Sequence, residues 1–135
     1  MALIATATLD STATSKYAQT IRTGGGHGLT ADEPVHAGGA DTGPAPYELL
    51  LSALGACTAI TLRMYAERKG WELGDVRVEL ALHKSRGAGD RITRVVRFGA
   101  ALTEAQRGRL AEIVEKTPVT LTIRQGAAIE TTFVG

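Results

Sequence analysis

Apolar residues concentrate most strongly in the middle of the chain, where they recur with the period of a helix. From Cys57, helical steps reach a mostly apolar set: Leu50, Ala53, Leu54, Ile60, Thr61 and Met64. Further apolar residues lie on the remaining sides. Pro46 suits the first helical position, and Gly70 suits the end of the helix. A helix that is apolar on nearly all sides is covered by other elements, so we expect this one to form the centre of the fold.

On both sides of this helix, apolar and polar residues alternate as they do in strands. The alternation predicts three short strands before the helix and a hairpin after it, whose residues are 3–9, 16–23, 28–31, 76–83 and 92–101. A last strand is expected over 128–134. Residues 32–46, rich in Gly and Pro, predict a long connection without regular structure, and a loop of that length in a compact domain usually has a function.

Two shorter helices are expected in the second half of the chain. Thr103 and Gln106 have the spacing of a capping box, and this helix should end at residue 116 or 117, ahead of Pro118. Residues 119–123 alternate like a strand, but Thr117 and Pro118 favour the start of a helix, which we prefer. Strands, helix, hairpin, helices and strand predict a single α+β domain over residues 1–135.

Composition narrows the range of functions. The chain has 135 residues, with fifteen Lys and Arg against fourteen Asp and Glu, so its charge does not favour nucleic acid or an anionic membrane. We expect neither as a partner. No apolar run approaches the roughly 20 residues of a membrane helix, and the N-terminus does not resemble a signal peptide. One cysteine forms no internal disulfide, so the cytoplasm is the expected compartment.

Cys57 is the only plausible nucleophile. Its alternative role is that of a small buried apolar residue, which is what most free cysteines are. A reactive cysteine needs a cation, a base or a helix N-terminus to stabilise its thiolate, and Cys57 lies too deep in its own helix to benefit from that helix's dipole. The activating charge must therefore come from another part of the fold or from a second chain.

Arg94 is the candidate for this charge, because its strand register places it on the same face as apolar Ile92, Val96 and Phe98. The alternatives are that its stem extends to solvent or that it pairs with a structural carboxylate such as Glu79. The three histidines have no ligand spacing, so neither a metal nor another cofactor is expected.

The segment from Gly38 and Gly39 through Gly43-Pro-Ala-Pro-Tyr-Glu-Leu-Leu-Leu to Ala56-Cys57-Thr58 resembles the OsmC/Ohr family of thiol-dependent hydroperoxide peroxidases. The resemblance runs from about residue 27 to the C-terminus. It implies an intertwined α+β homodimer, in which two central helices cross the interface and strands of each chain wrap the other. It also implies a role in the oxidative stress response.

The resemblance assigns residues to a peroxidase site only in part. Cys57 matches the reactive cysteine, but Thr117 stands where the family has its resolving cysteine. The family glutamate corresponds to Tyr47, with Glu48 one place away, and the loop that supplies the family's activating arginine contains none. We therefore take Cys57, Arg94, Glu48 and Thr117 as the candidate site, with Arg94 as the substitute cation.

Two functions remain open at this point. In the first, Cys57 reduces an organic hydroperoxide and is regenerated by an external thiol, because a hydroxyl at position 117 cannot form a disulfide. In the second, the chain is a catalytically inactive protein of the same fold that binds an apolar small molecule or has a structural role.

Overall fold

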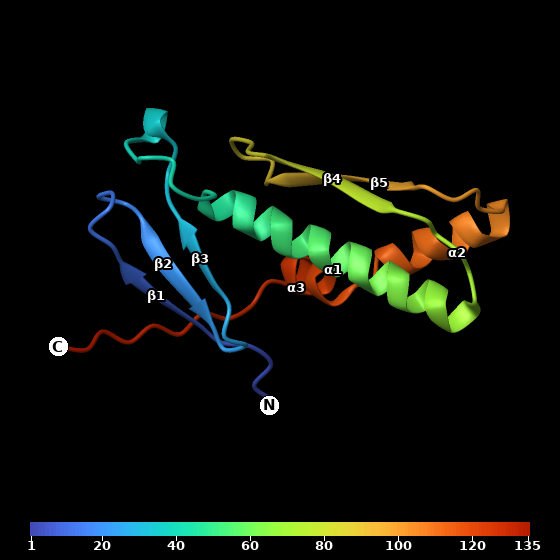
Figure 1. The fold of residues 1–135 in the computed structure, drawn as a ribbon, viewed down its shortest axis with the longest axis horizontal. Coiled ribbons are helices and arrows are strands. Elements are labelled where there is room, and N and C mark those ends of the chain that lie inside the picture. The colour runs from blue at the N-terminus through green and yellow to red at the C-terminus, as the bar shows by residue number, and fades with distance from the viewer. The chain divides into compact units, whose positions relative to one another are not determined.

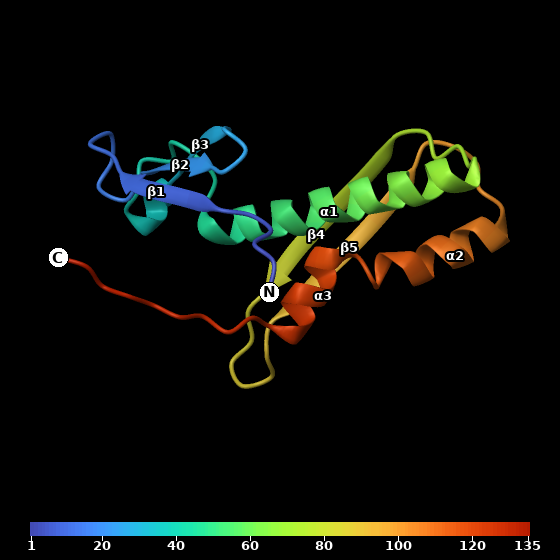
Figure 2. The same cartoon turned by 90° about the horizontal axis from the view of Figure 1, so that it is seen from below.

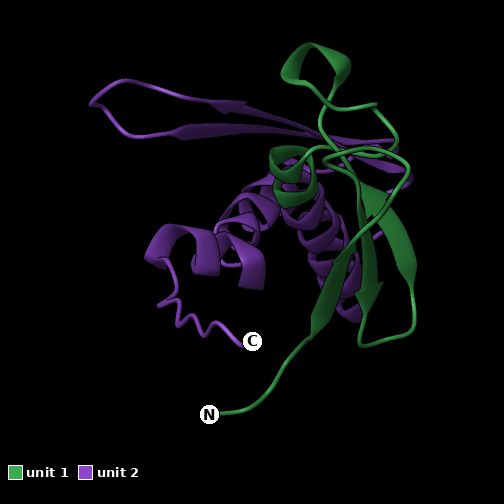
Figure 3. Cartoon of the chain, turned by 90° about the vertical axis from the view of Figure 1, so that its left-hand side faces the viewer, with its two compact units in different colours: residues 1–50 green, residues 51–135 purple.

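The computed structural model describes residues 1–135 and divides into two compact units, Met1–Leu50 and Leu51–Gly135 (Figure 3). Its elements follow one another as β1 (Ala7–Ser11), β2 (Gln19–Thr23), β3 (Gly28–Ala31), the short 3-10 helix η1 (Val35–Ala37), α1 (Pro46–Lys69), β4 (Val76–His83), β5 (Arg91–Phe98), α2 (Glu104–Val114) and α3 (Pro118–Gln125). With two antiparallel sheets and three α-helices, the fold is α+β, as the sequence pattern predicts.

In the first unit, β1, β2 and β3 form an antiparallel sheet in chain order. The loop that follows is organised by the carboxylate of Asp32, which is 2% exposed and accepts hydrogen bonds from the backbone N–H groups of Glu33, Ala40 and Thr42 and from the Thr42 hydroxyl. Burial would raise the pKa of Asp32, but these hydrogen bonds outweigh it and lower the pKa to about 2. The buried carboxylate of Asp32 thus joins residues 33, 40 and 42 of the long loop.

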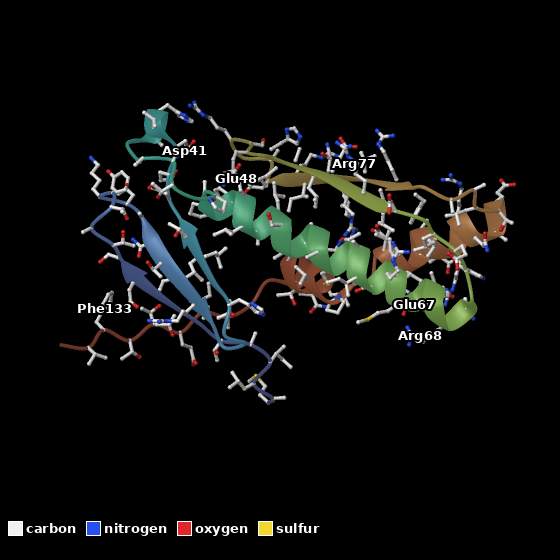
Figure 4. All side chains as sticks on the ribbon, in the orientation of Figure 1. Asp41, Glu48, Glu67, Arg68, Arg77 and Phe133 are labelled. Atoms are coloured by element: carbon white, nitrogen blue, oxygen red, sulfur yellow. The ribbon has the colours of Figure 1, made fainter.

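In the second unit, α1 and α2 pack beneath the β4–β5 hairpin (Figures 1 and 2). The hairpin register pairs Val78 with Val96 and Leu80 with Arg94, so alternate residues face the helices. Around the buried cluster of Leu62, Ala66, Leu73 and Leu110 lie partly buried side chains from the hairpin, including Val96 and Phe98. On the other face, Arg77 projects from β4 away from α1 (Figure 4).

The capping box at Thr103 and Gln106 is present, and the preference for a helix after Pro118 is confirmed. The element bounds differ from the predicted ones at several places. β1 begins at Ala7, β2 begins at Gln19, β5 ends at Phe98 and α2 ends at Val114. The predicted irregular loop also contains η1.

The strand expected over 128–134 is wrong for the isolated chain. These residues form no strand and leave α3 as an extended segment (Figure 1). Ile129 and Phe133 on this segment are 88% and 95% exposed. The alternating pattern is that of a strand, but a strand needs a neighbouring edge for its backbone hydrogen bonds, and no segment of this chain pairs with it.

By length and composition, α1 is apolar enough to cross a membrane, in contrast to what its sequence led us to expect. The core helix of a soluble protein meets the same criterion. Every fourth residue from Leu54 to Ala66 along α1 is buried within the fold, which is what a core helix shows.

Candidate functional site

Cys57 lies half-buried on α1, and its sulfur faces the beginning of α3. The backbone N–H of Val119 is directed at Cys57 Sγ, with 3.5 Å between nitrogen and sulfur. The hydroxyl oxygen of Thr61, one turn further along α1, is 3.9 Å from the sulfur. These two groups are the hydrogen-bonding neighbours of the thiol.

The N-terminus of α3 lacks the usual cap, which explains why its N–H reaches a sulfur. Thr117 occupies the N-cap position, but its side chain accepts no hydrogen bond from the helix backbone. Its hydroxyl is instead hydrogen-bonded to that of Thr120. Pro118 has no N–H, so Val119 carries the first free backbone donor of the helix. Cys57 Sγ therefore takes the place of the missing capping oxygen, at the helix end that favours negative charge.

Arg94 lies in the interior of the second unit, with only 12% of its side chain exposed. One terminal nitrogen, Nη1, donates to the hydroxyl oxygens of Thr58 and Thr120, each at 2.9 Å. The other, Nη2, donates to the Val114 carbonyl at 3.1 Å and lies 3.6 Å from Glu115 Oε2. The guanidinium thus joins α1, the end of α2 and α3.

Of the alternatives open for Arg94, extension to solvent is wrong. Its carboxylate partner is Glu115, whereas Glu79 pairs with Arg97 at 2.9 Å on the other face of β5. Burial lowers the pKa of Arg94, and the charge of Glu115 partly offsets this by raising it. Arg124 lowers the pKa of Arg94 further and Cys57 raises it. No hydrogen bond joins the two side chains.

Three threonines belong to this site: Thr117, which the sequence resemblance selected, and Thr58 and Thr120, which sequence reasoning did not select. Thr58 is fully buried, donates to the Leu54 carbonyl at 2.7 Å and accepts from Arg94. Thr117 is fully buried and Thr120 is 5% exposed. The available signal was the position of Thr58 directly after Cys57 and the spacing of Thr117 and Thr120 within the first turn of a helix. Neither pattern indicates on its own that an arginine binds there.

Glu48 lies in the first turn of α1, where its Oε1 accepts a hydrogen bond from the Ala45 N–H at 2.8 Å. This contact stabilises the beginning of the helix. Glu48 precedes Cys57 by about two and a half helical turns, at 3.6 residues per turn. The structure therefore brings together Cys57, Arg94 and the threonines around Thr117, and gives Glu48 a contact at the helix start.

No group of three or more His, Cys, Asp and Glu side chains is arranged to hold a metal ion. An apolar cavity of about 200 Å³ lies among α1, β5 and α2, lined by Leu62, Val96, Phe98, Arg107, Leu110, Ala111 and Val114. Cys57 does not line this cavity. The chemistry that the site itself offers is that of a thiol held at a helix N-terminus, which can react as a nucleophile.

Comparison with known proteins gives one family. A family model described as OsmC-like protein matches residues 38–132. An OsmC-like protein of Mycoplasma pneumoniae superposes with a TM-score of 0.75 at 20% identity, covering 92% of this chain and 89% of the other. The organic hydroperoxide resistance protein OhrB of Bacillus subtilis has a TM-score of 0.62 at 22% identity, with 90% and 91% covered.

A third solved structure, an organic hydroperoxide resistance protein OsmC of Legionella pneumophila, gives a TM-score of 0.64 at 20% identity, with 90% of each chain covered. At these identities the three structures establish the shared fold. Comparison with curated protein sequences gives no match.

Proposed function

Because the chain belongs to the OsmC-like protein family, we propose that it reduces organic hydroperoxides through Cys57, with an external thiol as reductant. One observation carries the proposal: the Cys57 sulfur accepts the first free N–H of α3, at a helix end that stabilises a thiolate. The names of the similar structures from Bacillus subtilis and Legionella pneumophila, both hydroperoxide resistance proteins, support the same class of substrate.

In the proposed reaction, the Cys57 thiolate attacks the terminal oxygen of the hydroperoxide. A sulfur–oxygen bond forms, the oxygen–oxygen bond breaks, and the organic part leaves as an alcohol after taking a proton. Cys57 is then a sulfenic acid. Arg94 donates a hydrogen bond to Thr58, the residue directly after Cys57.

Regeneration of Cys57 needs two external thiols, because the hydroxyl of Thr117 cannot form a disulfide. The first thiol attacks the sulfenic sulfur, which releases water and leaves a mixed disulfide. The second attacks that disulfide, which frees Cys57 and releases the oxidised external thiol. A chain with one cysteine that works in this way fits a reducing compartment, and we propose the cytoplasm.

We also propose that the protein is a homodimer. The side of α1 away from the hairpin carries apolar residues without a partner in this chain, among which Ile60 is 54% and Met64 57% exposed. Cys57 lies beside this face, three residues before Ile60. The exposed apolar segment 128–134 is a second feature that a partner chain would cover.

The experiment measures loss of cumene hydroperoxide, with hydrogen peroxide in parallel, when the protein is supplied with dithiothreitol. We expect thiol-dependent consumption of the organic hydroperoxide that is abolished in Cys57→Ser. Thr93→Val, on the exposed face of β5, is the control and should retain activity. Glu48→Gln tests the remaining candidate acid. Consumption that persists in Cys57→Ser, or that does not exceed the background of thiol alone, refutes the proposal.

The second candidate function is a catalytically inactive protein that binds an apolar molecule. It is favoured by the apolar cavity among α1, β5 and α2, which lies apart from Cys57, and by the absence of a resolving cysteine. Labelling with dimedone after peroxide treatment separates the two functions. A peroxidase accumulates a Cys57 sulfenic acid that dimedone traps, whereas an inactive protein shows no label at substrate concentrations that a peroxidase consumes.

A further inference from the structure

The N–H of Val119 meets the sulfur of Cys57, and the guanidinium of Arg94 binds the residue that follows each of them in the sequence. Thr58 directly follows Cys57, and Thr120 directly follows Val119. Both hydroxyls accept from the same nitrogen, Nη1 of Arg94, at 2.9 Å. Nη1 has two hydrogens, so these two contacts use its full donor capacity.

From this arrangement we propose that Arg94 is a positioning residue, which holds the N-terminus of α3 against the Cys57 sulfur. The inference rests on the proposed function, in which Cys57 is the nucleophile. It differs from the expectation drawn from the sequence, where Arg94 acts on the thiol directly through its charge. In the positioning role, the reactivity of Cys57 depends on the contacts between Arg94 and the threonines.

The contacts at Nη2 hold the segment that leads into α3. Nη2 donates to the carbonyl of Val114, the last residue of α2, three residues before the N-cap residue of α3. Thr120 is in turn hydrogen-bonded to Thr117, the N-cap residue itself. Arg94 therefore fixes both the segment that leads into α3 and the first turn of α3.

The charges near the guanidinium also favour positioning over direct activation. Glu115 lies 3.6 Å from Nη2 and compensates part of the positive charge. Glu115 also forms an ion pair with Arg124 of α3. The charged groups that face the Arg94 guanidinium are therefore Glu115 after α2 and Arg124 on α3. The group that contacts the sulfur directly is the backbone N–H of Val119 at 3.5 Å, whereas Arg94 contacts the threonines beside it.

The test measures the rate at which Cys57 reacts with iodoacetamide between pH 5 and pH 10, because this rate reports the thiolate and needs no peroxidase activity. The decisive variant is Thr120→Val, which keeps the shape of the side chain and the charge of Arg94 but removes the hydroxyl that links Arg94 to α3. We expect alkylation at pH 7 to slow by about two- to five-fold and its pH midpoint to move upward, which is the scale of a helix-end interaction.

The matched variants separate three roles for Arg94: positioning of α3, direct action through its charge, and a purely structural role. Thr120→Ser retains the hydroxyl and should keep the wild-type pH profile, and Arg94→Met should shift the profile as Thr120→Val does. Arg97→Met, on the opposite face of β5, is the control for loss of a positive charge and should have no effect. Melting temperatures of all variants are measured alongside.

Two results overturn the inference. If Arg94→Met shifts the profile while Thr120→Val does not, Arg94 acts through its charge. If both variants only lower the melting temperature and leave the pH midpoint unchanged, the contacts are purely structural. Failure of the proposed function looks different, because hydroperoxide consumption would then persist in Cys57→Ser or fail to exceed the thiol background in wild type, whatever the alkylation profiles show.

Discussion

A charge placed on the exposed apolar face of α1 should dissociate the proposed homodimer. The perturbation is the double variant Ile60→Lys with Met64→Lys, which puts two ammonium groups one turn apart on this face. Ile60 and Met64 are 54% and 57% exposed in the single chain, so a partner would bury about half of each side chain. Both residues point away from the buried cluster around Leu62, so the fold itself should tolerate the change.

The magnitude follows from the exposed fractions. Full burial of a side chain of this size contributes roughly 1.5–3 kcal/mol, so burial of the exposed half contributes about 1 kcal/mol. A two-fold axis brings both residues from each chain, which gives about 4 kcal/mol for the four side chains. At about 1.4 kcal/mol for each tenfold change, the dissociation constant should rise by about a thousandfold.

The assay is sedimentation velocity over protein concentrations from nanomolar to tens of micromolar. Wild type should sediment as a dimer at micromolar concentration, and the double variant as a monomer. Thr93→Lys, which adds one lysine to the solvent face of β5, is the control and should remain dimeric. The reasoning is refuted if the wild-type chain is a stable monomer at micromolar concentration, or if the double variant dimerises as tightly as wild type.

Three further predictions follow from single residues. The pKa of Asp32 is lowered from 3.8 to about 2, so the contribution of this carboxylate to stability is fully present above pH 4 and is lost as the pH falls through 2. Acid unfolding followed by circular dichroism should show this loss in wild type and a flatter pH profile in Asp32→Asn. Thr117→Cys should form a disulfide with Cys57 after mild oxidation, seen as the loss of both free thiols within one chain, and two thiols that stay reduced would contradict it. Leu73→Ala should lower the free energy of unfolding by about 2–5 kcal/mol in urea titrations, because Leu73 is fully buried; a loss below 1 kcal/mol would contradict its place in the core.

The local elements could be predicted from the sequence because their signals are local. The capping box at Thr103, the proline at the start of α3 and the alternation in the hairpin each depend on residues within one element, and each is present. Strand ends were less well defined, since alternation continues into residues that have no partner across the sheet. The strand expected over 128–134 is the extreme case, because its pattern is present but no segment of this chain pairs with it.

The site could be predicted only in part, because its contacts join distant segments. Sequence reasoning selected Cys57, Arg94 from its strand register, and Glu48 and Thr117 from the family resemblance. It concluded that the dipole of its own helix could not help Cys57, but the N-terminus of α3, sixty-two residues away, reaches the sulfur. No periodicity in the sequence indicates which helix end meets which side chain. The threonines that bind Arg94 were missed for the same reason.

The proposed regeneration by an external thiol and the proposed homodimer constrain each other at Cys57. Regeneration by an external thiol requires that a reductant reach the sulfur, whereas a dimer interface over Ile60 and Met64 covers the face beside it. Cys57 is half-buried even in the single chain. Both can hold only if the sulfur remains open on a side that the partner does not cover. The rate of regeneration should therefore depend on the size of the reductant. If the interface narrows the approach to the sulfur, a small thiol regenerates Cys57 faster than a protein dithiol of equal reduction potential. The Ile60→Lys, Met64→Lys variant, which lacks the interface, should lose this preference.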